Sequence, residues 1–352
     1  MAKPPDMTEQ TTPTFFRDTN RFAGLRPTAV FDSYWRFAAE RQAIFFRRLA
    51  GESAPWTADP ILARHRFTNA YRAADRVSQY LIREVIYGEG RAMDRQEQLF
   101  RILLFKLFNK IDTWQLLEDQ LGEVSWANFD LDAYDRVLSA AMRSGGKLYS
   151  AAYIIPPVKW PGGDGVKHRG HLYLIRTALS GTVPEELAAA TSLGQVFALL
   201  KQLPSLGDFL AFQLAIDLNY GTVIDFPEDS FVVAGPGARD GIAKCFENAA
   251  DYLAEDIIEF MHDRQEREFD RLGLNFRSLW GRPLQLIDCQ NLFCEISKYA
   301  RVAHPDVIGM SGRTRIKQIY KPQPAPHGVW FPPKWGLNDK LPPAPGLADH
   351  LL

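Results

Sequence analysis

The sequence predicts an all-α fold. Over most of the chain, apolar residues recur every three or four positions, which is the spacing that places them on one face of a helix. Strand-like alternation of apolar and polar residues is rare and leaves room for no more than a short β-hairpin. The clearest helix start is Ser192 with Gln195 three positions later, which is the pattern of a capping box.

The predicted helices follow in order from this spacing. The first is amphipathic and rich in aromatic residues, and the fourth ends at the pair Gly145-Gly146. The turn Gly235-Pro236-Gly237 precedes the ninth. The expected ranges are 31–49, 70–87, 95–110, 134–143, 172–179, 185–191, 192–202, 208–218, 238–246, 251–272 and 286–300.

The chain divides into three parts. We expect residues 1–25 to be a flexible N-terminal segment and residues 26–321 to form one helical domain. The range 322–352 contains eight prolines, which remove backbone donors and break helices, so we expect a Pro-rich tail without a regular domain.

Composition excludes several classes of protein. Of the 352 residues, 46% are hydrophobic and 24% are charged, as in soluble globular proteins. No apolar run reaches the length of a membrane span, and residues 1–15 lack the apolar core of a secretory signal. The three cysteines form no Cys-x-x-Cys pair, so we expect a reducing, cytoplasmic location and no metal site. No cofactor is expected either.

Charge is unevenly distributed although the net charge is only −1. Basic residues outnumber acidic ones between Arg64 and Lys110 and again between Ser297 and Lys321, whereas 251–270 is acidic. The two basic regions are expected to form a phosphate-binding surface, with the acidic helix facing away. The alternative is that these are ordinary solvated helix faces.

The stretch Leu203-Pro204-Ser205-Leu206-Gly207 lies between two predicted helices and resembles the helix-hairpin-helix of the DNA glycosylase superfamily. The N–H groups at a helix start favour an anion, and a glycine allows close approach of the backbone. The resemblance implies that DNA is a partner and that Leu203, Ser205 and Gly207 contact a phosphate. The alternative is an ordinary corner between two helices.

In that superfamily a functional aspartate follows the hairpin by roughly two dozen residues. The segment 223–233 lies at this distance, with Asp229 the closer match and Asp225 the alternative. The lysine that some members use falls at Phe209 and is absent, so Schiff-base chemistry from that position is excluded.

A polar stripe interrupts the apolar helix predicted at 286–300. Asp288, Asn291, Glu295 and Lys298 fall on one face at helical spacing. Burying such a stripe is costly unless its members are paired. The stripe therefore indicates either a binding cleft or an internal network of ion pairs.

Together these motifs resemble a narrower family, the helical domain associated with 5-hydroxymethyluracil DNA kinase, whose members include α-glutamyl/putrescinyl thymine pyrophosphorylases. The matching segments are 71–80, 105–110, 224–231, 235–246 and 288–295. The resemblance implies a glycosylase-like helical fold and action on, or recognition of, a modified thymine. In the implied pathway a kinase converts the hydroxymethyl group to a pyrophosphoryl ester, and a second protein displaces pyrophosphate with an amine.

A kinase activity within this chain is not expected. There is no Gly-x4-Gly-Lys-[Ser/Thr] motif, and 162–167 is only a glycine-rich loop. A separate 5-hydroxymethyluracil DNA kinase is therefore an expected partner. The leading hypothesis is a DNA-modifying transferase of the thymine-hypermodification type. The alternatives are a DNA glycosylase acting on a modified pyrimidine, and a non-catalytic module that presents modified DNA to a partner enzyme.

The transfer chemistry assigns roles to residues. An ammonium needs a carboxylate to hold and deprotonate it, and a leaving pyrophosphate needs basic or N–H donors. The predicted catalytic residues are Asp229, Glu295 and Asp225; the phosphate-binding residues are Gly237, Arg239 and Lys244. The DNA-binding residues are Leu203, Ser205, Gly207, Arg72, Arg76, Lys110, Lys298 and Arg301; base recognition is assigned to Asn109, Gln290, Asn291 and Tyr80. For Asn109 and Gln290 the alternative is a buried amide network, and for Tyr80 it is core packing.

Overall fold

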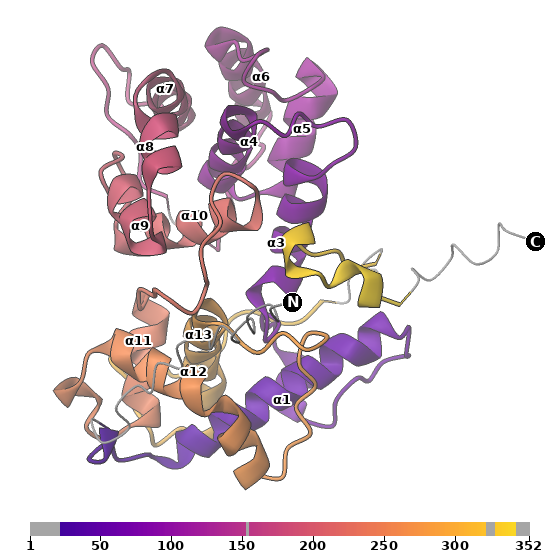
Figure 1. Cartoon of the computed structure of the whole chain (residues 1–352), viewed down its shortest axis with the longest axis vertical. Helices are drawn as coiled ribbons and strands as arrows, with labels where there is room; N and C mark the ends of the chain where they lie inside the picture. Colours follow the sequence, from indigo (N-terminus) through magenta and orange to yellow (C-terminus); the bar gives the residue numbers. More distant parts are fainter. Residues whose placement is uncertain (1–21, 153–154, 322–327, 343–352) are drawn as a thin grey trace, which may run out of the picture.

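The structure is a computed structural model that describes residues 22–152, 155–321 and 328–342. Across these ranges the fold is all-α, as predicted: there is no β-strand, and only isolated bridges form in place of the short hairpin that the sequence left open. The helices form two groups: the chain passes from α1 in one group to α4–α10 in the other, and it returns to the group of α1 after α10 (Figure 1). The same described ranges contain no helix with the length and apolarity needed to cross a membrane.

The first group is built around α10 (Asp208–Tyr220). Every residue of α10 from Leu210 to Tyr220 is buried, because α9 and α4 pack on it. Asp94 and Asp130 cap the starts of α4 and α6 by accepting backbone N–H groups. The other members are α4 (Arg95–Phe108), α5 (Ile111–Leu121), α6 (Leu131–Arg143), α7 (Lys167–Ser180), α8 (Val183–Ala189) and α9 (Leu193–Lys201).

The second group is built around α13 (Leu286–Ala303), against which the other three helices pack. These are α1 (Ala29–Leu49), α11 (Pro236–Cys245) and α12 (Ala254–Arg271). Glycines bring α11 unusually close to α13. A Cβ on Gly241 would lie 1.9 Å from the Phe293 carbonyl oxygen, so this crossing requires glycine.

The range 70–87 is not the single helix that was predicted. It contains the 3₁₀ turn η2 (Arg72–Ala74), the short helix α3 (Arg76–Tyr80) and the π-helical turn η3 (Leu81–Ile86). The interruption lies at Asp75, which has extended backbone and whose carboxylate accepts the Asn69 N–H at 2.8 Å. A local side-chain to backbone bond thus competes with the helix. The helices α2 (Pro60–Arg64) and α5 were not predicted.

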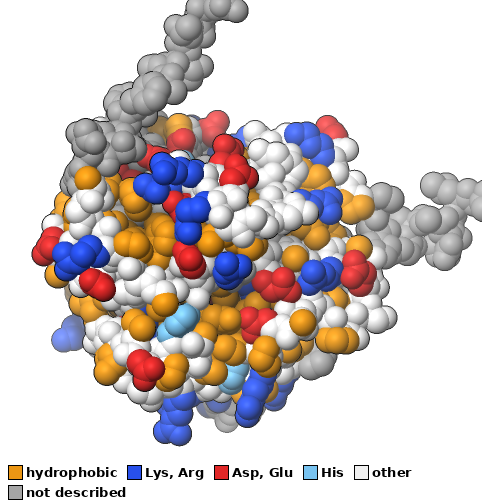
Figure 2. Space-filling model, turned by 90° about the horizontal axis from the view of Figure 1, so that it is seen from below, with side chains coloured by type: hydrophobic (Ala, Val, Ile, Leu, Met, Phe, Trp, Pro, Cys, Tyr) orange, Lys and Arg blue, Asp and Glu red, His pale blue; other side chains and the backbone are white. Residues whose placement is uncertain are grey.

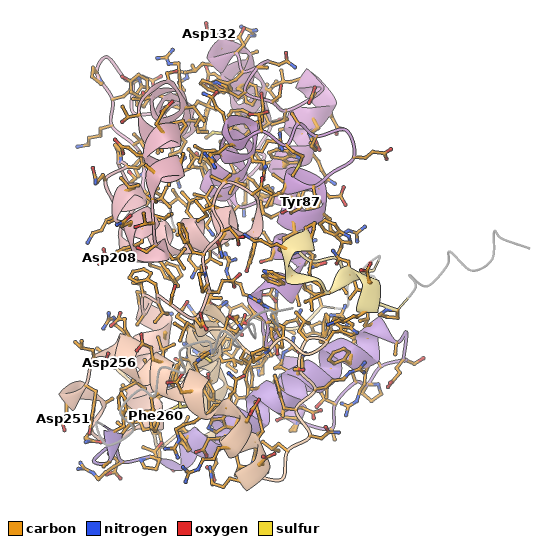
Figure 3. The ribbon with its side chains drawn as sticks, viewed as in Figure 1. Tyr87, Asp132, Asp208, Asp251, Asp256 and Phe260 are labelled. Carbon is orange, nitrogen blue, oxygen red and sulfur yellow. The ribbon has the colours of Figure 1, made fainter. Side chains whose placement is uncertain are left out.

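The described part of the Pro-rich tail, residues 328–342, is anchored to the body. The side-chain amide of Gln79 accepts the Trp330 N–H and donates to the Trp330 carbonyl, and Phe331 is fully buried. Tyr87, labelled in Figure 3, packs on the Trp330 ring and donates to the Tyr220 carbonyl. The segment forms only the 3₁₀ turns η5 (Pro333–Trp335) and η6 (Asn338–Lys340). The other predicted tail residues, 322–327 and 343–352, and residues 1–21 of the predicted flexible segment lie outside the described residues.

Candidate functional site

A polar pocket of about 480 Å³ lies where the loop after α10 meets the C-terminal segment. Its volume is within the usual range of small-molecule sites. Four stretches of chain supply its walls: the end of α10, the loop 225–229, the residues before α13, and η5. The lining residues are Asn219, Asp225, Phe226, Pro227, Glu228, Asp229, Arg282, Gln285, Lys334 and Trp335.

The loop takes its shape from the end of α10. The Asn219 side chain exchanges two 2.9 Å hydrogen bonds with the backbone N–H and carbonyl of Phe226. The chain therefore folds back over the end of the helix. Within the turn that follows, Glu228 points inward and is 5% exposed, whereas Asp225 and Asp229 are exposed. The three carboxylates thus occupy two depths of one pocket.

Two cations balance these carboxylates. Arg282 Nη2 lies 3.2 Å from Glu228 Oε1, and the Arg282 guanidinium stacks 3.9 Å above the Trp335 ring. Lys334 Nζ lies 3.0 Å from Asp225 Oδ1 and donates to the Ile224 carbonyl at 3.1 Å. Such an arrangement can bind a ligand that carries both a positive group and an anionic group.

A buried ionic layer supports the pocket from behind. Asp217 on α10 accepts a hydrogen bond from Arg72 Nη2 at 2.7 Å. Its other carboxylate oxygen forms an ion pair with Lys106 Nζ, also at 2.7 Å. Arg72 also donates to Gln213 and Tyr220, and its backbone N–H donates to Asp288. Burial acts to raise the pKa of Asp217, but the two cations outweigh it and hold that pKa below its ordinary value. The layer therefore joins α10, η2 and α13.

Asp288 connects this buried ionic layer to the wall of the pocket. Its carboxylate accepts the backbone N–H of Gln285, a pocket residue, at 2.9 Å and caps α13. Burial raises the pKa of Asp288 to about 6, although the two N–H groups that it accepts oppose the shift. Arg72 and Asp288 thus position the start of α13 rather than contact a ligand.

Of the predicted catalytic residues, Asp225 and Asp229 line the pocket and Glu295 does not. Glu295 accepts the Thr68 N–H at 3.0 Å and lies 2.8 Å from Lys298 Nζ. One part of the polar stripe of α13 therefore fits the predicted binding cleft, and another part fits the alternative of internal ion pairs. Asp288 supports the pocket, whereas Glu295 and Lys298 form an ion pair away from it.

The predicted hairpin is a turn between two helices, α9 and α10. Ser192 caps α9 by accepting the Gln195 N–H at 3.2 Å, while the Gln195 side chain bonds Thr191 instead of Ser192. Ser205 has a left-handed φ of 69° and donates to the Pro157 carbonyl. Gly207 is exposed, and a Cβ built on it meets nothing within 4 Å.

The structure corrects the predicted surroundings of Arg72, Lys244 and Gly237. Arg72 is 5% exposed within the ionic layer, so it does not lie at a surface where DNA phosphates bind. Lys244 is 2% exposed and donates to the Ser297 carbonyl at 2.9 Å, with Asp240 beside it. A Cβ on Gly237 would lie 2.4 Å from Cys294 Sγ, so helix packing accounts for this glycine.

The remaining predicted contacts are dispersed. Arg239 forms an ion pair with Glu255 at 2.8 Å, and Lys110 forms one with Asp112 at 3.2 Å. Arg76 is exposed. Arg301 donates a hydrogen bond to the Arg315 carbonyl. Among the base-recognition residues, Asn109 is buried and ends α4 with a φ of 48°, and Gln290 is buried against Gln213. Tyr80 stacks on Phe105, and Asn291 is partly exposed. None of these four residues lines the pocket.

The two predicted basic regions do meet at one place. Arg66 N–H donates to the Gln318 carbonyl and Tyr320 N–H to the Arg64 carbonyl, so 64–66 and 318–320 run side by side. We call the exposed arginine and lysine residues of these two segments and their neighbours the basic strip. Its members are Arg64, Arg66, Arg313, Arg315, Lys317 and Lys321.

Of the ten residues that line the pocket, sequence reasoning nominated only Asp225 and Asp229. Glu228 stands between the two nominated aspartates, so the segment was found but its buried member was not. Arg282 and Gln285 precede α13, beside the stripe that was noticed. Lys334 and Trp335 come from the Pro-rich tail, where the aromatic residues among the prolines were the available signal. The described residues contain no cluster of three metal-binding side chains.

Comparisons with known proteins agree on one family. A family model described as "5-hmdU DNA kinase, helical domain" matches residues 28–309. The "5-hmdU DNA kinase" of Bacillus phage SP10 is 30% identical over 291 residues, which cover 77% of this chain and 45% of the relative. The chain thus spans less than half the length of that relative. No solved structure matches.

Proposed function

This chain belongs to the family of 5-hmdU DNA kinase helical domains, and from that premise we propose that it modifies 5-hydroxymethyluracil-derived bases in DNA by exchanging pyrophosphate for an amine. The single observation that supports this best is the pocket, which places three carboxylates beside Arg282 and Lys334. Carboxylates hold an ammonium, and the two cations hold a departing pyrophosphate.

In the proposed reaction the amine nitrogen attacks the methylene carbon on C5 of the base. A C–N bond forms, the C–O bond to pyrophosphate breaks, and its electron pair leaves with the pyrophosphate oxygen. Asp229 and Asp225 would hold the ammonium at the exposed side of the pocket, and Arg282 with Lys334 would stabilise the negative charge that develops on the leaving group. Closely placed charges of both signs suit this exchange.

The base must reach the pocket from DNA. A target base either leaves the duplex or comes from a single strand before a deep site can act on it. The Trp335 ring lines the pocket and offers a flat face for stacking, although Arg282 covers one side of it. We expect the C-terminal segment to contribute to base binding for this reason.

DNA binding is proposed for the Gly207 turn and the basic strip. On the face of the molecule seen in Figure 2, basic and acidic side chains are intermixed and do not form one continuous positive area. Binding should therefore depend on these local features rather than on overall charge, which is −1. Neutralised phosphates release counterions, so affinity should fall with added salt.

Replacing Gly207 with valine tests the turn. The glycine is exposed with open space around it, so folding should change little, whereas a side chain would keep a phosphate away from the N–H groups at the start of α10. We expect weaker DNA binding and a shallower dependence of affinity on salt, measured by fluorescence anisotropy of a labelled oligonucleotide. Wild-type affinity and salt slope in the folded variant would show that the turn is only a corner between helices.

Replacing Asp229 with asparagine tests the pocket. Losing a charge-assisted hydrogen bond of about 1.5–3 kcal/mol should reduce turnover about ten- to hundred-fold. DNA affinity should be largely unchanged, because the exposed Asp229 belongs to neither the turn nor the basic strip. Turnover is followed as amine-dependent release of pyrophosphate from DNA that carries the pyrophosphoryl ester. Asp164→Asn, a change at an exposed aspartate that pairs with Arg169 outside the pocket, the turn and the basic strip, is the matched control. Equal turnover in wild type and Asp229→Asn would remove Asp229 from the site.

A further inference from the structure

We infer that Glu228 is the proton acceptor for the incoming amine; this role rests on the proposed exchange reaction. Glu228 lines the inner part of the pocket and is 5% exposed, whereas Asp225 and Asp229 lie at its exposed side. Within the described part of the chain, Glu228 Oε1 is buried without a hydrogen-bond donor of good geometry, although Arg282 Nη2 is 3.2 Å away. A buried carboxylate with unused hydrogen-bonding capacity beside a pocket can accept an N–H from a ligand.

The surroundings of Glu228 suit proton transfer near neutral pH. Burial raises the pKa of its carboxyl to about 7, and Asp288 acts in the same direction, while Arg282, Lys334 and Arg72 oppose the shift. These four residues come from the stretch before α13, α13 itself, η5 and η2, and the buried Tyr220 at the end of α10 also faces the carboxylate. A general base works best when its pKa lies close to the working pH.

The proton balance of the reaction defines the step. An alkylamine, with a pKa near about 10.4 as in lysine, enters as an ammonium and has no lone pair for attack. One N–H proton passes to the Glu228 carboxylate, and the freed nitrogen pair forms the C–N bond as pyrophosphate departs. The product is a secondary ammonium, which keeps its two nitrogen protons at neutral pH, and Glu228 returns its proton to solvent. Before the transfer, Arg282 neutralises the negative charge of Glu228. Once Glu228 is protonated and has lost that charge, Arg282 contacts the departing pyrophosphate.

The sign of the pH dependence follows. Below about pH 7 Glu228 carries a proton and cannot accept another, so wild-type turnover with an alkylamine should fall as pH decreases through 7. Above that value the carboxylate is free and this dependence disappears. Glu228→Gln lacks the base, so its turnover should keep rising above pH 7, until the pH reaches the pKa of the amine itself.

Two amines separate the role of Glu228 from the proposed function. DNA with a synthetic 5-(pyrophosphoryloxymethyl)uracil is incubated at pH 7 with 1,4-diaminobutane or with methoxyamine, which is far less basic and already unprotonated. Glu228→Gln should lose about 10²–10⁴-fold of turnover with diaminobutane and remain within a few-fold of wild type with methoxyamine. Unchanged turnover with diaminobutane, or equal loss with both amines, would overturn the inference. If wild type forms no adduct with either amine, the proposed function itself fails.

Glu268→Gln is the matched control. Glu268 is 1% exposed and is held by Arg264 and Arg271 on α12, outside the pocket, so it loses a comparable buried ion pair. It should keep wild-type turnover with both amines, and thermal unfolding of both variants reports their folding. If Glu228→Gln does not fold, the role of Glu228 is tested by comparing the pH dependence of wild-type turnover with the two amines. The alkylamine profile should fall below pH 7 and the methoxyamine profile should not, and identical profiles would contradict the role.

Discussion

Replacing Asp217 with alanine is expected to lower the free energy of unfolding by about 3–5 kcal/mol. Asp217 is 3% exposed and lies 2.7 Å from both Arg72 Nη2 and Lys106 Nζ. Its removal takes away the carboxylate that contacts both buried cations. Burial already lowers the pKa of Lys106 to about 8, so this lysine is expected to lose its proton in the variant, while Arg72 stays charged. Urea unfolding followed by circular dichroism measures the change.

Asp208→Ala provides the comparison on the same helix. Asp208 lies at the start of α10, where Figure 3 labels it, and its ion pair with Lys201 is 60% exposed on the Asp208 side. Exposed pairs contribute about 0–1 kcal/mol, so the variant should unfold almost as wild type does. If the two variants lose similar stability, the buried layer does not hold the two helix groups together as described.

Replacing Arg282 with alanine is expected to reduce turnover about 10²–10³-fold, as loss of a preorganised donor does in other active sites. Arg282 lines the pocket, neutralises Glu228 and stacks on Trp335, so it links the proposed base, leaving group and stacking surface. The measurement is pyrophosphate release from the modified DNA at saturating amine. Arg282→Lys keeps the charge and should recover part of the loss.

Arg264→Ala is the control for this variant. Arg264 also pairs with a buried carboxylate, Glu268, and stacks on a ring, that of Phe260, which Figure 3 labels on α12. It lies outside the pocket, so turnover should stay at the wild-type level even where stability falls. Equal turnover in Arg264→Ala and Arg282→Ala would show that the pocket is not where the chemistry occurs.

Local patterns were sufficient for most helices. The Ser192 cap and the apolar spacing of 208–218 fix α9 and α10, because both signals depend only on neighbouring residues. The same reasoning missed the break at Asp75, where a hydrogen bond from Asn69 competes with the helix. It also missed the separate helix α5, because Asn109 adopts a left-handed conformation without a glycine to signal it. In both places one side chain decided the backbone path.

The site was predicted only in part for a related reason. Asp225 and Asp229 were nominated because the glycosylase resemblance places a functional aspartate at their distance from the hairpin, and both line the pocket. Glu228 differs from them by burial, and Trp335 reaches the pocket from more than one hundred positions along the chain. Arg72 and Lys244 were assigned to DNA and phosphate binding because both need basic donors, whereas each has buried partners that a sequence pattern cannot reveal.

Mass spectrometry of nucleosides tests the central claim most directly. DNA carrying 5-(pyrophosphoryloxymethyl)uracil is incubated with the protein and 1,4-diaminobutane, digested to nucleosides and analysed against a reaction without protein. The proposed function predicts a nucleoside in which the amine replaces pyrophosphate on the 5-methylene carbon, with one pyrophosphate released for each adduct. Release of a free base with an abasic site, or binding to DNA with no change in the nucleosides, would contradict it.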